Sequence, residues 1–322
     1  MTGASSRDLL DVLGVDVALL QAPIGACASP RLVAAVAEAG ALGTLACTWT
    51  APADLARVVG QVRELSGRRF AANLVLWFPV DAQLDALLGL GVPLVTFSWG
   101  QPGRARVARC HESGARVVVQ VGSAAGARQA VADGADVLIA QGVEAGGHVQ
   151  STTPLDDLVR DVLEVAGPVP VIAAGGLALA GDVAHARALG AAGAMLGTRF
   201  LATAESAAHA AYKSALVDAG AGATALTVCF SGGWPHAPHR VLRNATLERW
   251  EAAGCPAPGR RPGDDAPPAV RAGKAIARYD DAPPLAGDAG AVGEMCLYAG
   301  TGCSAIDDAP AVAELIDRLT GS

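Results

Sequence analysis

One stretch of the chain decides the fold: residues 169–200 read VPVIAAGGLALAGDVAHARALGAAGAMLGTRF. A short apolar run, Val169–Ala174, ends in two glycines, and an Ala-rich stretch with helix-like composition follows it. A second apolar run, Ala194–Phe200, comes next. Short continuous apolar strands that alternate with helices are typical of parallel sheet buried on both faces. The segment therefore predicts a strand–helix–strand unit.

The same unit repeats through the first two-thirds of the chain. Eight apolar runs are expected to be strands: Val17–Pro23, Leu42–Cys47, Phe70–Leu76, Leu94–Ser98, Arg116–Val121, Val137–Ala140, Val169–Ala174 and Ala194–Phe200. The stretches expected to be helices are Pro30–Ala39, Pro52–Leu65, Asp81–Leu88, Arg104–Glu112, Ala124–Ala132, Pro154–Val165, Ala180–Leu189 and Glu205–Val217. Eight such units with none left over predict an α/β fold of the (β/α)₈ TIM barrel type.

Length and the first turn support a barrel over an open sheet. The chain has 322 residues, and such barrels typically need about 250 residues, often with insertions. A doubly wound sheet would place G-x-G-x-x-G after its first strand. Residues 22–26 read APIGA, which does not fit that pattern.

The character of the sequence changes after Val217. The segment 218–284 holds Gly233-Trp234-Pro235, a Pro-rich run at 256–268 and many charges. These features predict an irregular excursion with one helix, Val241–Ala252, and an amphipathic helix at Asp308–Thr320 closes the chain. We expect residues 1–223 to form the barrel and residues 224–322 to pack on its active face, within the same domain or as a small subdomain.

Composition and charge disfavour several classes of protein. The formal net charge is −7, the pI is near 5.3, and Lys and Arg do not cluster, which disfavours nucleic-acid binding. No apolar run is long and uncharged enough for a transmembrane helix, and Met1–Asp11 lacks the apolar core of a secretory signal. The seven cysteines are scattered without a CxxC pair, so we expect free thiols of a cytoplasmic protein and no metal site.

In this fold, catalytic groups come from loops at the carboxyl ends of the strands. The seventh and eighth predicted strands end in Gly175-Gly176 and Gly197-Thr198. Because glycine lacks a Cβ, its backbone N–H can approach phosphate oxygens closely, and a helix N-terminus adds a favourable partial charge. Glycine at the same place in two adjacent units favours a phosphate site over two tight turns.

The sixth predicted strand runs into the loop Gln141–His148, in which His148 follows two glycines. An ordinary imidazole pKa near 6.5 would suit proton abstraction at neutral pH, and the alternative is a surface or capping histidine. Asn73 and Gln120, at the ends of strands three and five, would hydrogen-bond a heterocycle or satisfy backbone groups. We expect Glu144 to pair with a neighbouring backbone N–H rather than to act as a second acid or base.

The other histidines carry weaker signals. His111, His185 and His209 fall in predicted helices and are expected to be solvated or structural. His236 and His239 form an H-x-x-H pair in the excursion, but no further metal ligand lies near them in the sequence. They are interpreted as residues of a simple loop or of a lid near the substrate.

With these residues in view, the chain resembles the nitronate monooxygenase family, formerly called 2-nitropropane dioxygenases. It is also similar to the related flavin-dependent enoyl-acyl-carrier-protein reductases. The segments AQGVEAGGH, at 140–148, and GAMLGTRFLAT, at 193–203, are specific to this superfamily. The other matching segments are Gln21–Ile24, Ala39–Gly43, Phe70–Leu74, Pro170–Gly176, Glu205-Ser206, Tyr212-Lys213 and Tyr298–Gly300.

The resemblance implies FMN as the cofactor and His148 as the catalytic residue. The FMN-binding residues would be Ala22, Pro23, Ile24, Asn73, Gln120, Gln141, Gly146, Gly147, Gly175, Gly176, Met195, Gly197, Thr198, Tyr298 and Gly300. Residues 22–24 would approach the isoalloxazine, Asn73 and Gln120 would hydrogen-bond it, and the glycine pairs would take the phosphate. His148 would deprotonate a nitroalkane or stabilise a bound nitronate. The flavin would carry the redox chemistry with O₂, which yields a carbonyl compound and nitrite.

The sequence departs from the family's pattern at two places, and two alternative functions are also considered. Thr301 stands where the family often has Gln, so a cofactor or substrate contact there is expected to differ. Ser98-Trp99 stands where relatives often place a histidine or another aromatic residue, so substrate choice is expected to differ from the family standard. One alternative is an FMN reductase that uses NAD(P)H on an enoyl thioester or a quinone. The other is a barrel lyase or isomerase that binds its substrate's own phosphate. The expected partners are a small anionic substrate such as a nitronate, and O₂, with no nucleic acid or membrane; a homodimer is one option for assembly.

Overall fold

A computed structural model describes residues 6–321, with the side chains of residues 8–321. The expectation for Met1–Asp11 falls partly on residues 1–5, which lie outside the described residues. The strands of the central sheet are β1 (Leu19–Gln21), β2 (Thr44–Ala46), β3 (Ala71–Val75), β4 (Leu94–Ser98), β5 (Arg116–Val121), β6 (Val137–Gln141), β8 (Val171–Ala174) and β9 (Gly193–Leu196).

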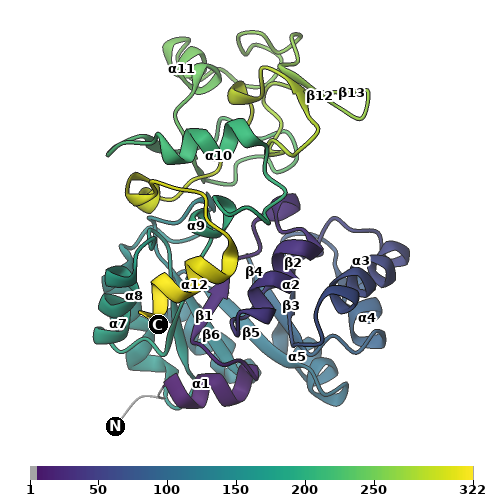
Figure 1. Ribbon diagram of the computed structural model, residues 1–322, viewed down its shortest axis with the longest axis vertical. Coiled ribbons are helices and arrows are strands. Elements are labelled where there is room, and N and C mark those ends of the chain that lie inside the picture. The colour runs from purple at the N-terminus through teal and green to yellow at the C-terminus, as the bar shows by residue number, and fades with distance from the viewer. Residues whose placement is uncertain (1–5, 322) are drawn as a thin grey trace.

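These strands form a closed parallel ring. Their order is β1-β9-β8-β6-β5-β4-β3-β2 across 8 strands, and a parallel bridge between Leu20 and Leu42 joins the two ends. Two backbone hydrogen bonds support the closure, from Leu42 N to Leu19 O at 3.0 Å and from Gln21 N to Leu42 O at 2.9 Å. The predicted (β/α)₈ TIM barrel is confirmed (Figure 1).

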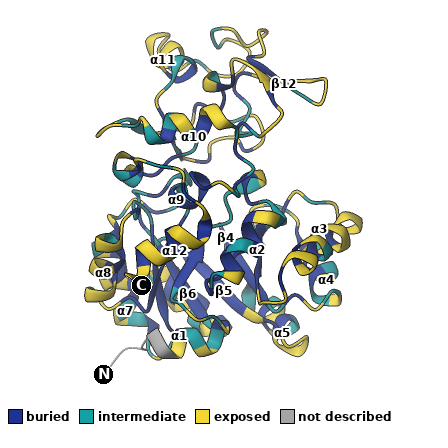
Figure 2. Ribbon diagram, in the orientation of Figure 1, coloured by how far each residue is buried: buried dark blue, intermediate teal, exposed yellow. Residues whose placement is uncertain are grey.

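Helices cover the outside of the ring. Those of the barrel units are α2 (Pro30–Glu38), α3 (Pro52–Leu65), α4 (Asp81–Gly89), α5 (Gly103–Glu112), α6 (Ala124–Asp133), α7 (Leu155–Ala166) and α8 (Ala180–Ala188). The others are α1 (Ser6–Leu13), α9 (Thr198–Leu201), α10 (Ala210–Val217), α11 (Ala245–Ala252), α12 (Val312–Thr320) and the 3₁₀ turns η1 (Gly25–Cys27), η2 (Val292–Glu294) and η3 (Thr301–Ala305). Figure 2 shows buried strands at the centre and exposed outer helix faces.

The alternating direction of side chains along each strand divides the hydrophobic core into a part inside the ring and a part under the helices. Residues such as Leu94, Val118 and Ile172 point into the ring, where they pack with Leu9 and Leu13 of α1. Their neighbours, such as Val95 and Val117, face outward and pack under the helices. Because successive side chains on a strand point to opposite faces, a strand buried on both sides is apolar throughout. Helix α1, which was not predicted, closes the end of the barrel opposite α10 and α11 (Figure 1).

Residues 218–309 are more ordered than the predicted irregular excursion. A 3-stranded sheet has the order β10-β11-β7, built from β10 (Thr224–Thr227), β11 (His239–Leu242) and β7 (Gly147–His148). A second, of the order β13-β12-β14, contains β12 (Ala269–Arg271), β13 (Lys274–Ile276) and β14 (Ala289–Gly290). The strands were missed because they are only two to four residues long, too short to show alternation.

Four predicted boundaries are wrong by four or five residues, each for a local reason. The strand expected at Ala194–Phe200 ends at Leu196 because Gly197 leaves the extended conformation and α9 begins. The helix expected at Glu205–Val217 starts only at Ala210, where the His209 side chain caps it. The helix expected at Val241–Ala252 begins after Asn244, whose side chain accepts a hydrogen bond from Leu247 N. The final helix begins at Val312 rather than Asp308, because Asp308 instead pairs with Arg199.

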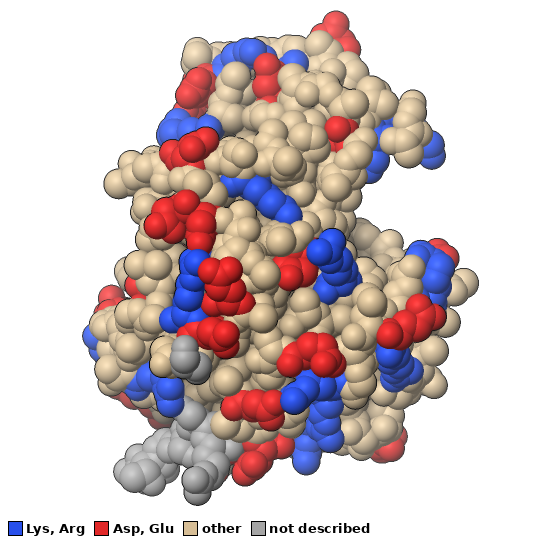
Figure 3. Space-filling model, viewed as in Figure 1, with Lys and Arg blue, Asp and Glu red and all other residues tan. Residues whose placement is uncertain are grey.

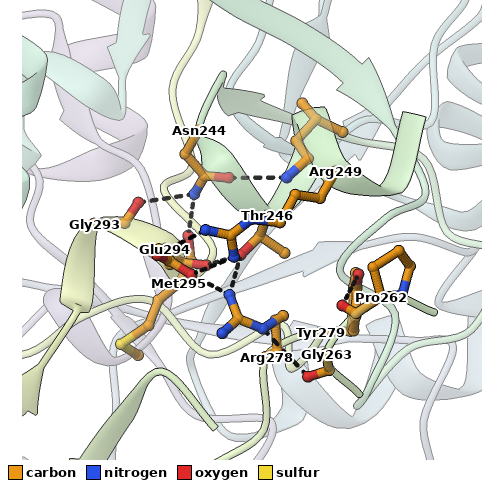
Figure 4. Close-up of polar contacts among 11 residues, drawn as sticks. Asn244, Thr246, Arg249, Pro262, Gly263, Arg278, Tyr279, Gly293, Glu294 and Met295 are labelled. Atoms are coloured by element: carbon orange, nitrogen blue, oxygen red, sulfur yellow. Dashed lines mark hydrogen bonds and ion pairs between the residues drawn. The ribbon is translucent and has the colours of Figure 1, made fainter. Parts of the chain in front are cut away.

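A polar network holds together residues 218–309, which we call the outer part of the chain (Figure 4). The Glu294 carboxylate binds the guanidinium groups of Arg249, at 2.9 Å, and Arg278. The Asn244 amide donates to the carbonyl oxygens of Gly293, at 3.0 Å, and Met295, at 2.8 Å. A small apolar cluster that includes Phe230, Trp250 and Tyr279 packs nearby. The outer part therefore has a core of its own above the barrel.

The surface charges, the helix lengths and the cysteines bear on the classes of protein considered from composition. Figure 3 shows acidic and basic side chains mixed on the face in view. Within residues 6–321, no helix is both long enough and apolar enough to cross a bilayer. All seven cysteines are free thiols, and all except Cys255 are buried.

We predict that Leu9→Ala destabilises the barrel from its closed end. Leu9 is fully buried among the inward-facing strand residues, so the substitution leaves a cavity that costs about 2–4 kcal/mol of unfolding free energy. Urea denaturation followed by circular dichroism measures the loss. Leu65→Ala is the control because Leu65 is 56% exposed; equal effects of the two substitutions would contradict the role of α1.

Candidate active site

A cavity of about 590 Å³ lies at the carboxyl ends of the barrel strands, between the barrel and the outer part of the chain. All sixteen residues of the predicted site line it: Ala22, Pro23, Ile24, Asn73, Gln120, Gln141, Gly146, Gly147, His148, Gly175, Gly176, Met195, Gly197, Thr198, Tyr298 and Gly300. The volume falls within the range of small-molecule sites, roughly 300–1,000 Å³. The fold thus brings every predicted residue to one place, including two from the C-terminal part.

Close packing requires glycine at positions 175 and 176, on one side of the cavity. Gly175 and Gly176 have φ of +117° and +72°, values that residues with a Cβ rarely adopt. A Cβ on Gly176 would lie 2.9 Å from Glu144 Cβ and from Thr301 Oγ1. On the facing segment, the Thr198 hydroxyl accepts a hydrogen bond from Gly300 N at 2.9 Å. Backbone N–H groups can therefore come close to a ligand here, as phosphate binding needs.

The loop that carries His148 is held by the outer part of the chain. Its last two residues form β7, which pairs antiparallel with β11 in the register His148 to His239 and Gly147 to Arg240. The Arg240 guanidinium also donates to Val143 O at 2.9 and 3.2 Å. The predicted loop thus ends as a strand. This pairing fixes the backbone position of His148, from which its side chain extends.

Aromatic rings surround the His148 imidazole. Its centroid lies 4.4 Å from that of Trp234, 5.5 Å from Tyr298 and 6.2 Å from Trp99. Burial, reinforced by nearby His239, lowers the pKa of His148 to about 3. The ordinary pKa expected from the sequence is therefore wrong, because burial among rings penalises the charged imidazolium.

His239 is a structural neighbour of His148. It is fully buried, with Nδ1 2.9 Å from Ala237 O, and Nε2 accepts from Phe230 N at 3.2 Å. These two contacts fix a neutral tautomer with hydrogen on Nδ1. The ring centroids of His239 and His148 are 5.3 Å apart. His239 thus packs behind His148 and does not itself line the cavity. Within residues 6–321 no group of three or more potential ligands could hold a metal.

The remaining histidines make structural contacts on the barrel exterior and at a helix start. His111 lies 2.8 Å from Asp136, and His185 lies 2.8 Å from Asp156. His209 Nδ1 accepts from Ala211 N at 3.0 Å, which caps α10. The expectation that these three are solvated or structural is confirmed.

Polar atoms without partners border the cavity. Gln141 Oε1 and His148 Nε2 are both buried and make no hydrogen bond within the described chain. The Asn73 amide nitrogen donates to Thr96 Oγ1 at 2.9 Å, which leaves its oxygen for a ligand. Buried polar groups are nearly always hydrogen-bonded, so the unpaired atoms indicate that a polar ligand completes the site. With the glycine cradle, this donor and acceptor set fits a phosphate-bearing heterocycle such as FMN.

Comparison with known proteins identifies the family. The family model described as Nitronate monooxygenase matches residues 6–84 and 78–322. The chain belongs to the nitronate monooxygenase family. It is therefore an enzyme of the oxidoreductase class, and the family resemblance expected from the sequence is confirmed.

Individual members of the nitronate monooxygenase family and its relatives resemble the chain at moderate identity. A Mycobacterium tuberculosis enzyme named (3aS,4S,5R,7aS)-5-hydroxy-7a-methyl-1-oxo-octahydro-1H-indene-4-carboxyl-CoA dehydrogenase is 36% identical over 248 residues, which cover 76% of this chain and 68% of that one. A Nitronate monooxygenase of Pseudomonas aeruginosa is 32% identical, covering 69% of this chain and 76% of that one. The solved nitroalkane oxidase of Streptomyces ansochromogenes is 31% identical, covers 98% of this chain and 97% of its own, and superposes with a TM-score of 0.81.

Several lining residues of this nitronate monooxygenase family member were not predicted. Trp49, Phe78 and Trp234 line the cavity, as do Arg271 and Asp281. Burial raises the pKa of Asp281 to about 6, helped by neighbouring Asp280. Trp234, Arg271 and Asp281 lie in the C-terminal excursion, where no strand end locates a residue. Trp49 and Phe78 lie in the loops that follow β2 and β3, and they carry no titratable group that would single them out. The Gly233-Trp234-Pro235 motif was the one available signal.

Glu144 has the structural role that was expected. Both of its carboxylate oxygens accept from Leu155 N, at 3.0 and 3.2 Å, at the start of α7, and its backbone oxygen accepts from Thr301 N at 3.0 Å. An anion at the first turn of a helix also interacts favourably with the helix dipole. Thr301, one of the two departures from the family pattern, packs against Gly176 and does not line the open cavity.

We predict that Glu144→Gln changes stability more than chemistry. Gln keeps one acceptor for Leu155 N but loses the negative charge, so the free energy of unfolding should fall by roughly 0.5–1 kcal/mol. Turnover should stay within about twofold, and the pH dependence of kcat/KM should keep its shape. Loss of one limb of that pH profile would instead make Glu144 an acid or base.

Proposed function

We propose that this enzyme is an FMN-dependent nitronate monooxygenase that oxidises alkyl nitronates with O₂ to a carbonyl compound and nitrite. The observation that carries the proposal is the neutral His148, whose buried and unpartnered Nε2 borders the same cavity as the glycine cradle. A neutral hydrogen-bond donor beside a cofactor site suits an anionic substrate. The proposal agrees with the named activity of the Pseudomonas relative.

The cofactor would be held by residues of the barrel rim. Gly175, Gly176, Gly197 and Thr198 would bind the phosphate through backbone N–H groups and one hydroxyl, and Asn73, Gln120 and Gln141 would hydrogen-bond the ring system. FMN, when bound, supplies the one-electron chemistry with the substrate and with O₂. The protein supplies binding, orientation and a site shielded from water.

His148 is better suited to binding an anion than to removing a proton from carbon. A general base works best when its pKa lies near the operating pH, and the pKa of His148 is about 3. A neutral imidazole with hydrogen on Nε2 can donate to a nitronate oxygen, and the bound anion would raise the imidazole pKa. The proposed substrate is therefore the preformed nitronate rather than the neutral nitroalkane.

The walls around His148 restrict access of water. Trp234 and Tyr298, both from the outer part of the chain, stack within 4.4 and 5.5 Å of its ring. In such surroundings a single hydrogen bond to a charged group is stronger than in water. The outer part of the chain therefore contributes to reactivity as well as to enclosure.

We predict that Gly176→Ala weakens FMN binding. The new Cβ would approach Glu144 and Thr301 at 2.9 Å with φ at +72°, so the cradle must shift. The FMN dissociation constant, measured by fluorescence on reconstitution, should rise about tenfold or more. Gly181→Ala is the matched control because Gly181 lies in α8 with open space around it. An unchanged dissociation constant for Gly176→Ala would place the phosphate elsewhere.

We predict that His148→Ala retains bound FMN and loses turnover of nitronates by about 10²-fold, as the loss of one preorganised donor typically costs. The flavin absorbance spectrum reports retention, and oxygen consumption reports turnover. His111→Ala, which alters an exposed histidine of α5, should behave as the unaltered enzyme. Nitronate turnover by His148→Ala at the unaltered rate would remove the assignment.

The pH dependence follows from the same pKa. Because the folded-state pKa of His148 is about 3, its neutral form persists above that value and is lost only as the pH falls toward it. Asp281 also lines the cavity and has a pKa of about 6, so the measurement is made on Asp281→Asn, which removes that titration. In this variant the rate with freshly prepared nitronate should stay level from about pH 8 to about pH 5, without a step near the ordinary imidazole value of about 6.5. A step near 6.5 in Asp281→Asn would contradict the neutral imidazole.

One rival function has a specific observation in its favour, since the 36% identical relative is named a dehydrogenase. An NAD(P)H-dependent reductase would show bleaching of the flavin by NADPH without oxygen. Mixing the enzyme anaerobically with NADPH, and separately with a nitronate, discriminates the two. Bleaching by the nitronate alone supports the monooxygenase.

A further inference from the structure

Several aromatic residues gather in one wall of the cavity. Only 4% of residues are aromatic, yet three of the five tryptophans line the cavity: Trp49, Trp99 and Trp234. The ring centroids of Trp99 and Trp234 are 4.6 Å apart, those of Phe78 and Trp234 are 5.2 Å apart, and those of Trp49 and Phe78 are 5.6 Å apart. Together with the 4.4 Å contact between His148 and Trp234, they form a continuous path of rings.

This path runs from the buried imidazole to the surface. Trp234 is 2% exposed, whereas Trp49 is 60% exposed although it also lines the cavity. Trp49 is held edge-on against Phe78, with an interplanar angle of 67°, so its ring is positioned at the rim. An exposed, positioned tryptophan continuous with a buried aromatic wall is an apolar surface that a ligand can cover.

The backbone at Trp99 is held in an unusual conformation. Its φ is +57°, in the left-handed region that bulky residues rarely adopt. Its N–H donates to Gln150 Oε1 at 3.0 Å. Such outliers persist when the surrounding structure fixes them and they occur often at binding sites. The strain places the indole in the cavity wall beside His148.

The charged lining residues offer no free cation for a second anionic group. The Arg271 guanidinium is engaged with Asp288, at 2.7 and 2.8 Å, and with Pro283 O at 2.7 Å. The remaining charged lining residue is Asp281. A ligand group that extends along the aromatic wall is therefore best matched when it is apolar and uncharged.

We propose that the substrate carries a ring-bearing apolar body that extends from the reacting anion beside His148, along Trp234 and Phe78, to Trp49 at the rim. The substrate class is thus arylalkyl or polycyclic rather than a nitroalkane of two or three carbons. This rests on the proposed function only in taking the cavity as the substrate site. Stacking on aromatic residues contributes about 0.5–1.5 kcal/mol for each pair, which corresponds to roughly two- to twelvefold in affinity.

The test uses two carboxylates, because a carboxylate is a planar anion like a nitronate but is not oxidised. Propionate and 3-(2-naphthyl)propionate are titrated calorimetrically into the FMN-loaded enzyme. We expect the naphthyl compound to bind at least tenfold more tightly. Trp49→Ala should weaken its binding three- to tenfold and leave propionate within twofold, and Trp49→Phe should restore part of the loss.

Trp77→Ala is the matched control. Trp77 is 65% exposed and packs against Trp234 at 6.4 Å, but it does not line the cavity, so both affinities should stay unchanged. Equal affinity for the two carboxylates, or equal losses in the two alanine variants, would overturn the proposal. Binding is measured without turnover, so a failure of nitronate oxidation would appear separately, in oxygen consumption.

Discussion

The antiparallel pairing of β7 with β11 is the constraint on which the active site depends. β7 has only two residues, Gly147 and His148, and a strand that short has no sheet of its own to satisfy its backbone groups. β11 supplies the partners, and its other edge pairs with β10. A bridge from Val241 to Tyr298 ties a second cavity residue to the same strand. One strand of the outer part thus positions two neighbouring residues of the cavity wall, whose ring centroids are 5.5 Å apart.

Burial decides the chemistry that the imidazole can perform. The aromatic rings that enclose His148 lower its pKa to about 3, so the side chain is neutral where an exposed histidine would titrate. A neutral donor in an apolar wall favours an anion that arrives already formed. The glycine cradle and the imidazole line the same cavity, so cofactor and substrate can be held by different loops of a single ring.

Much of the site could be predicted from the sequence because it lies at strand ends. Apolar runs separated by helical stretches locate the eight strands, and the residues after them, such as Gly175 and Gln120, must then meet at one rim. Trp234 and β11 were missed because the segment that carries them has no repeat to give its place. The predicted pKa of His148 was also wrong, because the rings that bury it come from segments distant in the sequence. Glu144 was correctly assigned because a helix start nearby needs an acceptor.

The outer part of the chain has its own apolar cluster and its own ion-pair network around Glu294. It also packs on the barrel, since Leu242 and Leu297 share an apolar cluster with Leu201 of α9, and Trp234 packs against Val75 of β3. Trp234 and Tyr298 belong to this outer part, while Gly175 and Gly176 belong to the barrel. Residues of the outer part can therefore change the shape of the wall around His148 while the glycine cradle of the barrel keeps its sequence, which gives one scaffold a route to new ligand preferences.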